Sequence, residues 1–324
     1  MKMQESHLLT RFARHAIICA ALLLAVSCGG RKKAAPAVEQ ERSFPTISVP
    51  TAYTEPAERI EYLINHYWDE YFAGSGRTDS ARIIGVPKAG VEQALANYIA
   101  VLNEAPLPQA QKSVAHLFDQ IAAKQVADTS QRVYLAMTEI VARYLYDPNS
   151  PLRDEDLYLP FVQRMAESSL TKEEMRTAYR YEAQMCAINP RGSIAPDFII
   201  TLRGGTQVRM HSIKADRLIL FFSNPGCHNC KEIIDALKSD KIVQEMVSYG
   251  QLAIANVYID EDLKAWREYM PIYPKEWLNG YDAAHILRQD QLYCIRAIPS
   301  LYLLDADKLI LLKDAPLDRL LKAL

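Results

Sequence analysis

Two cysteines with the spacing of a redox pair, Cys227 and Cys230, lie in the stretch FFSNPGCHNC at residues 221–230. Two thiols at this spacing can form a reversible disulfide, or they can supply half of a zinc site. Cys227 follows an apolar run and a short turn, and a helical pattern begins directly after it. Because unpaired backbone N–H groups at the start of a helix stabilise a thiolate, we expect Cys227 to be the reactive sulfur. Cys230 would lie one turn further along, more buried and within bonding reach.

A zinc site would need two more ligands beside this pair. The sequence has no second pair of the same spacing, and the other cysteines beyond the N-terminal region, Cys186 and Cys294, are single residues. Structural zinc sites typically combine two such half-sites. We therefore favour thiol–disulfide chemistry, and we expect neither a metal nor an organic cofactor.

The segments around the cysteines alternate between strand and helix patterns. Apolar or β-branched runs predict strands at 197–202, 208–213, 218–222, 252–260, 300–305 and 309–314. Helical patterns occupy 229–248, an insert after residue 260, and the closing residues 317–324. Strands that alternate with helices favour an α/β layer fold, and about 130 residues suffice for one such domain. We expect residues 191–324 to form this domain.

Three separated motifs within residues 194–324 resemble thioredoxins. The segment YCIRAIPSLYLLD at 293–305 is similar to the thioredoxin segment in which an Ile-Pro bond precedes a strand. The segment LAIANVYIDED at 252–262 is similar to the strand that precedes an aspartate-containing turn, and the segment from 193 to 230 resembles the entry of TlpA-like thioredoxins. The whole chain resembles a family of Gram-negative lipoproteins with a helical domain of unknown function ahead of a thioredoxin-like domain.

This resemblance implies roles for individual residues. It makes Cys227 the catalytic nucleophile and Cys230 the resolving thiol, and it makes the bond between Ile298 and Pro299 cis. That arrangement would turn the backbone of Ile298 toward Cys227, where its N–H and C=O can pair with a substrate peptide as a strand does.

Several positions depart from the thioredoxin pattern. Gly226 replaces the tryptophan that is common before the first cysteine, so the surface around the thiol should be flatter and less apolar. His228, a candidate substrate contact, lies between the cysteines, where a charged imidazole would favour the thiolate and a solvated one would not. Cys294 replaces a glycine. We interpret it as a buried, inert thiol; the alternatives are a third redox thiol and a pair with Cys186.

The resemblance also predicts a slow second step. Thioredoxins keep a buried aspartate on the strand before the first cysteine and a lysine on the next strand, a pair associated with removing the proton of the second thiol. The aligned positions here are Phe221 and Asn256, neither of which can act as a base. Burial disfavours a thiolate, so attack by Cys230 should be slow at neutral pH and faster at alkaline pH unless another base reaches it. Glu232 and His228 are the nearest candidates in sequence.

Residues 56–190 carry helical patterns. Apolar residues at spacings of three and four predict a helix at 57–72, and similar patterns follow at 90–105, 110–125, 132–147 and 154–169. Segments rich in Gly or Pro separate them. We expect a bundle of five or six helices that ends at the Pro/Gly junction before residue 191.

The N-terminus has the pattern of a signal peptide. Lys2, Arg11 and Arg14 precede an apolar run at 16–26, which is shorter than the roughly 20 residues of a membrane-spanning helix. The stretch LLLAVSC resembles a bacterial lipobox. The resemblance implies that residues 1–27 are removed and that Cys28 carries lipid.

The residues after the expected lipid site predict a flexible tether. Residues 28–55 are rich in Pro, Ala and charge and show no apolar periodicity. Gly29 is not the aspartate that, in the lipoprotein pattern, retains a chain in the inner membrane. We therefore expect an outer-membrane anchor in the lipid bilayer that faces the periplasm, where a disulfide can form and persist.

The composition is typical of globular domains and gives no support for nucleic acid binding. Hydrophobic residues make up 49% of the chain, charged residues 23%, and the formal net charge is −2. We expect a membrane-anchored thiol–disulfide oxidoreductase that reduces protein disulfides and receives electrons from a membrane thiol reductase. The alternative is a non-catalytic binding or scaffold lipoprotein whose helical domain recognises a partner.

Overall fold

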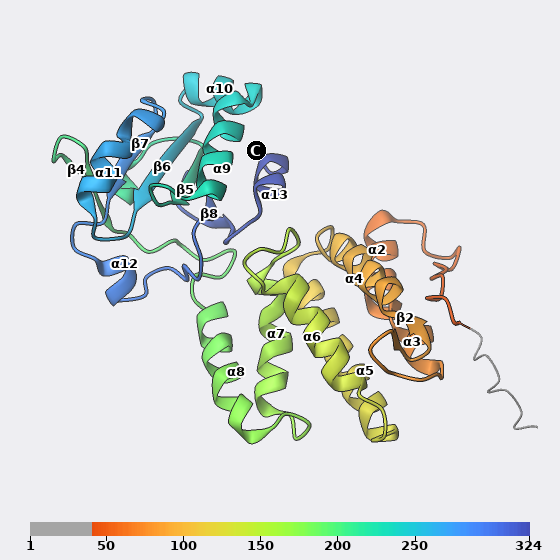
Figure 1. Ribbon diagram of the computed structural model, residues 1–324. Helices are drawn as coiled ribbons and strands as arrows, with labels where there is room; N and C mark the ends of the chain where they lie inside the picture. Colours follow the sequence, from red (N-terminus) through yellow and green to blue (C-terminus); the bar gives the residue numbers. More distant parts are fainter. Residues whose placement is uncertain (1–40) are drawn as a thin grey trace, which may run out of the picture. The chain divides into compact units, whose positions relative to one another are not determined.

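The computed structural model describes residues 41–324, which form a helical half followed by an α/β half (Figure 1). This confirms the fold class expected for these residues. The expected signal peptide and Cys28 lie outside the described residues. No helix within 41–324 is both long enough and apolar enough to cross a membrane.

The helical half has seven α-helices between residues 41 and 190, where the sequence pattern predicts five or six. The first expected helix is divided at Trp68, and a last helix follows residue 172. A short hairpin that the pattern does not indicate lies between the second and third helices. The elements are α2 (Pro56–His66), α3 (Asp69–Ala73), β1 (Arg82–Ile83), β2 (Val86–Pro87), α4 (Lys88–Leu102), α5 (Leu107–Ala127), α6 (Val133–Leu145), α7 (Glu155–Glu167) and α8 (Glu173–Cys186).

The segment before α2 lies on the core of the helical half. Residues 41–55 contain neither helix nor strand, but the ring of Phe44 stacks on that of Tyr71 with 5.2 Å between centroids. Arg42 donates hydrogen bonds to the backbone carbonyls of Glu70 and Tyr71. Arg42 and Phe44, at the start of the described segment, therefore contribute to the packing of the helical half.

The α/β half contains one seven-stranded sheet with the strand order β4-β3-β7-β6-β5-β8-β9. The interior strand β5 runs parallel to β6, the middle strand of the sheet, and antiparallel to β8. The strands are β3 (Ile199–Leu202), β4 (Gln207–Arg209), β5 (Arg217–Phe222), β6 (Leu252–Tyr258), β7 (Leu278–Tyr281), β8 (Ser300–Asp305) and β9 (Ile310–Leu312). The helices are α9 (His228–Ser239), α10 (Lys241–Ser248), α11 (Leu263–Tyr269), α12 (Ile286–Gln289) and α13 (Leu317–Lys322), with short 3-10 turns at Met210–Ser212 and Met270–Ile272.

Strand β5 is buried on both faces, which explains its continuous apolar sequence. Ile219 and Phe221 pack with α9 in one core, whereas Leu218, Leu220 and Phe222 belong to a second core on the other face. Burial on both faces holds the end of β5 in place. The turn that carries Cys227 begins directly after this end.

Strand β7 lies inside the segment for which the pattern predicts a helical insert. It pairs in parallel with β6 and antiparallel with β3, so it joins the entry hairpin to the central strands. The closing strand of that hairpin is also shorter than expected, because β4 ends at Arg209 and a 3-10 turn follows.

Candidate active site

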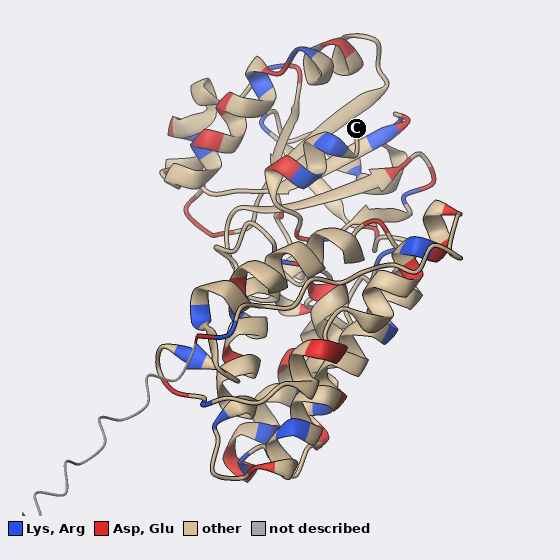
Figure 2. Cartoon of the chain, turned by 90° about the vertical axis from the view of Figure 1, so that its right-hand side faces the viewer, with Lys and Arg blue, Asp and Glu red and all other residues tan. Residues whose placement is uncertain are grey.

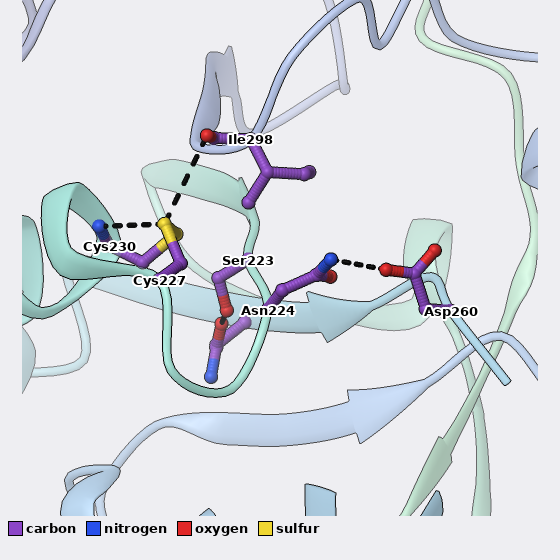
Figure 3. The surroundings of a disulfide bond; sticks show 7 residues. Ser223, Asn224, Cys227, Cys230, Asp260 and Ile298 are labelled. Carbon is purple, nitrogen blue, oxygen red and sulfur yellow. Dashed lines mark hydrogen bonds between the residues drawn. A yellow bond between two sulfur atoms is a disulfide. The ribbon is translucent and has the colours of Figure 1, made fainter. Parts of the chain in front are cut away.

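Cys227 and Cys230 form a disulfide at the start of α9 (Figure 3). Cys227 is the residue that caps the helix, and its sulfur accepts a hydrogen bond from the backbone N–H of Cys230 at 3.1 Å. Cys227 is half-buried and Cys230 is only 1% exposed. The two sulfurs are therefore unequal: a substrate can reach the first, whereas the second contacts mainly the apolar core around Ile234.

The segment before Pro299 faces the disulfide from the other side. The bond between Ile298 and Pro299 is cis, as the resemblance implies. The carbonyl oxygen of Ile298 lies 4.0 Å from Cys227 Sγ (Figure 3). Ile298 is half-buried, so part of this residue is accessible beside Cys227.

The turn between β5 and α9 requires a glycine before Cys227. Gly226 has a φ of +74°, in the left-handed region that residues with a side chain rarely adopt. A tryptophan at this position would strain the turn, which accounts for the departure from the thioredoxin pattern. Asn224 holds the other end of the turn through a hydrogen bond from its side chain to Asp260, and Asp260 also pairs with Arg288.

A buried network without formal charge lies next to this turn. Ser223 Oγ donates to Asn256 Oδ1 at 2.5 Å, and Asn256 Nδ2 donates to Asn279 Oδ1 at 3.0 Å. Asn279 in turn donates to the carbonyl oxygen of Pro274 at 2.7 Å. Burial raises the pKa of nearby Tyr273 to about 12, so this phenol is neutral at physiological pH. The network therefore consists of hydroxyl and amide groups, and its Asn256 occupies the position aligned with the lysine of the thioredoxin pattern.

Phe221 and Asn256, the positions aligned with that acid and lysine, are direct neighbours across β5 and β6. Both are buried, with exposed fractions of 0% and 1%. The sequence comparison therefore places them correctly beneath the site, although it does not indicate the network formed by Asn256.

His228 lies on the exposed surface of the first turn of α9. Its imidazole is 85% exposed and pairs with the carboxylate of Glu232 at 3.2 Å. Of the two interpretations that the sequence allows, this geometry favours the solvated histidine. The charge of a protonated His228 would be compensated by the carboxylate of Glu232.

The two remaining cysteines of the described chain are free and completely buried. Cys294 Sγ lies 3.7 Å from Glu155 Oε1, and Lys313 Nζ donates to the backbone carbonyl of Cys186 at 2.8 Å. Burial, and then the charge of Glu155, raises the pKa of Cys294 to about 12 and that of Cys186 higher still. Both thiols are buried, as the sequence interpretation expects of Cys294, and we expect them to be unreactive in the folded protein.

A buried ion cluster beside these thiols is the main feature that the sequence does not reveal. Glu155, at the start of α7, pairs with Arg296 at 2.5 Å and with Lys313 at 2.9 Å. Arg296 also donates to the carbonyl of Tyr146 at 2.6 Å, and its guanidinium lies 3.9 Å from the centre of the Tyr146 ring. Because Arg296 precedes Ile298 by two residues, the cluster links the helical half to the segment that faces Cys227.

Within residues 41–324, no group of three or more His, Cys, Asp or Glu side chains has a geometry that could hold a metal ion.

Basic and acidic residues are interspersed along the helices and loops of the described part, as Figure 2 shows.

The sequence of the helical half identifies the family. Residues 26–189 match the family model described as a domain of unknown function, DUF5106. The chain belongs to the DUF5106 family.

Solved structures extend the likeness of this DUF5106 protein to its α/β half. It is 35% identical to a thioredoxin-like protein from Bacteroides caccae, with a TM-score of 0.71 over 87% of this chain and 98% of that chain. The C-terminal domain of an uncharacterized protein from Bacteroides fragilis is 38% identical over 43% of this chain and 99% of that chain, with a TM-score of 0.42. The thioredoxin domain of a thiol-disulfide oxidoreductase from Bacteroides vulgatus is 22% identical over 41% and 94%, with a TM-score of 0.37. No curated protein matches the sequence.

The DUF5106 protein is therefore a thioredoxin-like protein with an N-terminal helical domain of unknown function, as the resemblance predicts. Its disulfide lies where the thioredoxin fold places a strand end, a helix start and a proline loop together. The individual roles of Cys227, Cys230 and Pro299 stay predictions, which the proposals below make testable.

Proposed function

We propose that the DUF5106 protein is a thiol–disulfide oxidoreductase that reduces protein disulfides through Cys227 and Cys230. The observation that carries the proposal is the unequal pair: a half-buried sulfur at the cap of α9, and a buried partner in bonding contact with it. The helix start stabilises negative charge on the first sulfur, and a low thiolate pKa is what makes a thiol a nucleophile at neutral pH. Half-buried Ile298 lies beside it, and we expect its backbone to pair with a substrate strand.

The reaction consists of two exchanges at sulfur. The thiolate of Cys227 attacks one sulfur of the substrate disulfide, the substrate S–S bond breaks, and its other sulfur leaves as a thiolate that takes up a proton. The thiol of Cys230 then loses its proton and attacks Cys227 Sγ in the mixed disulfide, which releases the second substrate thiol. The substrate gains two electrons, and the protein is left with the Cys227–Cys230 disulfide seen in the structure.

A substitution assay tests the assignment. Cys227→Ser should abolish the reduction of a model protein disulfide by the reduced protein, because a hydroxyl cannot form the mixed disulfide. Cys294→Ala is the matched control, since it removes a thiol that lies outside the site and should leave the rate unchanged. A Cys227→Ser variant that kept the parental rate would refute the proposal.

The same reaction cycle needs a source of electrons and a place where it operates. We propose that a membrane thiol reductase regenerates the two thiols, and that lipid on Cys28 anchors the protein in the outer membrane facing the periplasm. Cys28→Ala should release the protein into the soluble periplasmic fraction. Cys19→Ala, which removes a cysteine of the apolar run, is the control and should leave the protein in the membrane fraction. Unchanged membrane fractionation of Cys28→Ala would contradict the anchor.

A further inference from the structure

A groove of about 390 Å³ lies beside the disulfide and continues the candidate active site. One wall is the exposed side of α9 with Asn229 and Ile233, and a second is the proline loop with Ile298. The third wall comes from the helical half, where Pro148 and Asn149 lie in the loop between α6 and α7. The groove is therefore shared by the two halves of the described chain.

The third wall is an ordered turn. The side chain of Asp147 accepts the backbone N–H of Asn149 at 2.8 Å, and its carbonyl accepts the N–H of Ser150 at 2.9 Å. Ser150 Oγ then donates to the carbonyl of Tyr144 at 2.6 Å. These bonds fix the position at which Pro148 and Asn149 face the groove.

The same loop is attached to the α/β half at its far end. Arg153 pairs with Asp314 at 3.4 Å and donates to the carbonyl of Ala315 at 3.3 Å. The side chains of Arg153 and Asp314 are only 12% and 7% exposed. Together with the pair between Glu155 and Arg296, these contacts hold the third wall against the proline loop. Water shields such buried pairs little, so the wall should keep its place when a substrate enters.

The lining suits an apolar side chain in an extended segment. Ile233, Ile298 and Leu317 are only partly covered by the core, and their remaining surface lines the groove. One acidic and one basic side chain, Glu232 and Arg153, also reach it, and they leave no excess of either charge. Ile298 lies against Cys227 and also lines the groove. A substrate segment paired with the backbone of Ile298 would therefore place in the groove the side chain that is adjacent to its attacked cysteine.

We propose that Pro148 and Asn149 make the helical domain a specificity-determining wall of this groove, which accepts an apolar side chain adjacent to the reacting cysteine of an extended substrate segment. The proposal rests on the oxidoreductase function proposed above. It gives the helical half a role in the choice of substrate, whereas the chemistry stays with the two cysteines.

Peptides and one small disulfide can test the groove separately from the chemistry. The probes are two disulfide-bonded peptides that differ only in a leucine or an aspartate beside the cysteine, and hydroxyethyl disulfide, which is too small to occupy the groove. The wild-type protein should reduce the leucine peptide about tenfold faster, a discrimination typical of one apolar side chain in a pocket. Asn149→Trp should fill the groove and remove this preference, because it should lower the rate with the leucine peptide far more than the rate with hydroxyethyl disulfide.

The matched control is Asn97→Trp, the same change at an exposed position on α4 that does not line the groove. It should keep the preference for leucine. A preference that survives in Asn149→Trp, or a wild-type protein that reduces both peptides equally, would overturn the inference. An equal loss with all three disulfides in Asn149→Trp would also overturn it, because the loop would then act on the chemistry. A wild-type protein that reduces none of them would overturn the proposed function itself.

Discussion

The carboxylate of Glu155 on α7 accepts a hydrogen bond from Arg296 Nε at 2.5 Å, and its other oxygen lies 2.9 Å from Lys313 Nζ. Glu155 and Lys313 are almost completely buried, with side-chain exposures of 1% and 0%. Buried charges are tolerated only while their partners neutralise them, because the interior cannot solvate them as water does. The two halves of the chain are therefore joined by groups whose charges depend on one another.

Removal of Glu155 should destabilise the protein strongly. In Glu155→Ala the charges of Arg296 and Lys313 lose their common partner, and we expect the free energy of unfolding to fall by about 3–5 kcal/mol, as for other broken buried pairs. Urea unfolding followed by tryptophan fluorescence measures the change. The control is Glu268→Ala, which breaks an exposed pair with Lys264 and should change the free energy of unfolding by less than about 0.5 kcal/mol. Equal stability of Glu155→Ala and the wild type would contradict this description of the cluster.

The free thiols should resist alkylation in the folded protein. Burial holds the pKa of Cys294 at about 12 and that of Cys186 above it, so both are protonated from neutral pH to about pH 9, where an ordinary thiol with a pKa of about 8.5 is already ionised. Iodoacetamide should label Cys227 in the reduced native protein, and it should label Cys186 and Cys294 only after unfolding. Mass spectrometry of peptides before and after denaturation distinguishes the sites. Rapid labelling of Cys294 in the native state would show that the thiol is accessible and reactive after all.

The second exchange should accelerate with pH. The network of Ser223, Asn256 and Asn279 contains no carboxylate, so it supplies no base for the proton of Cys230. We expect the release of a mixed disulfide at Cys227 to become faster across roughly pH 7 to 9, as the thiolate fraction of a thiol grows. Stopped-flow measurement of substrate thiol release tests this.

The first exchange provides the control for that measurement. Formation of the mixed disulfide in Cys230→Ala reports attack by Cys227 alone, and its dependence on pH can be compared with that of release. A release rate that is flat from about pH 6 to 9, the interval around an ordinary thiol pKa, would mean that a base assists Cys230.

The arrangement of the candidate site can be predicted from the sequence because its signals are local. Cys227 and Cys230 stand together, and the turn before them follows an apolar strand that is buried on both faces. The proline loop has its own motif, so the resemblance could place Pro299 opposite the cysteines although it lies far along the chain. The sequence shows that Gly226 departs from the thioredoxin pattern, but only its backbone conformation in the structure explains why a tryptophan is absent.

Features that depend on contacts between residues far apart in the chain cannot be predicted from the sequence patterns. Strand β7 contains Asn279 and Gly280, two residue types that are rare in strands. In the structure, Gly280 lets the backbone of β7 approach Ile200 and Thr201 closely, and Asn279 completes the polar network with Asn256. The acidic residues 154–156 have the pattern of an ordinary solvated helix start. Nothing in their spacing indicates that Glu155 meets Arg296, 141 positions away in the chain.

The central claim is that Cys227 and Cys230 form a working redox couple. Equilibrating the protein in glutathione or dithiothreitol buffers of graded potential and counting free thiols by mass-tagging tests this most directly, with a Cys227→Ser variant as the blank. We predict one reversible two-electron transition between about −300 and −120 mV, the range covered by thioredoxin-like proteins and neighbouring disulfides. A pair that shows no reversible transition in these buffers would contradict the account and favour a binding or scaffold role for the domain.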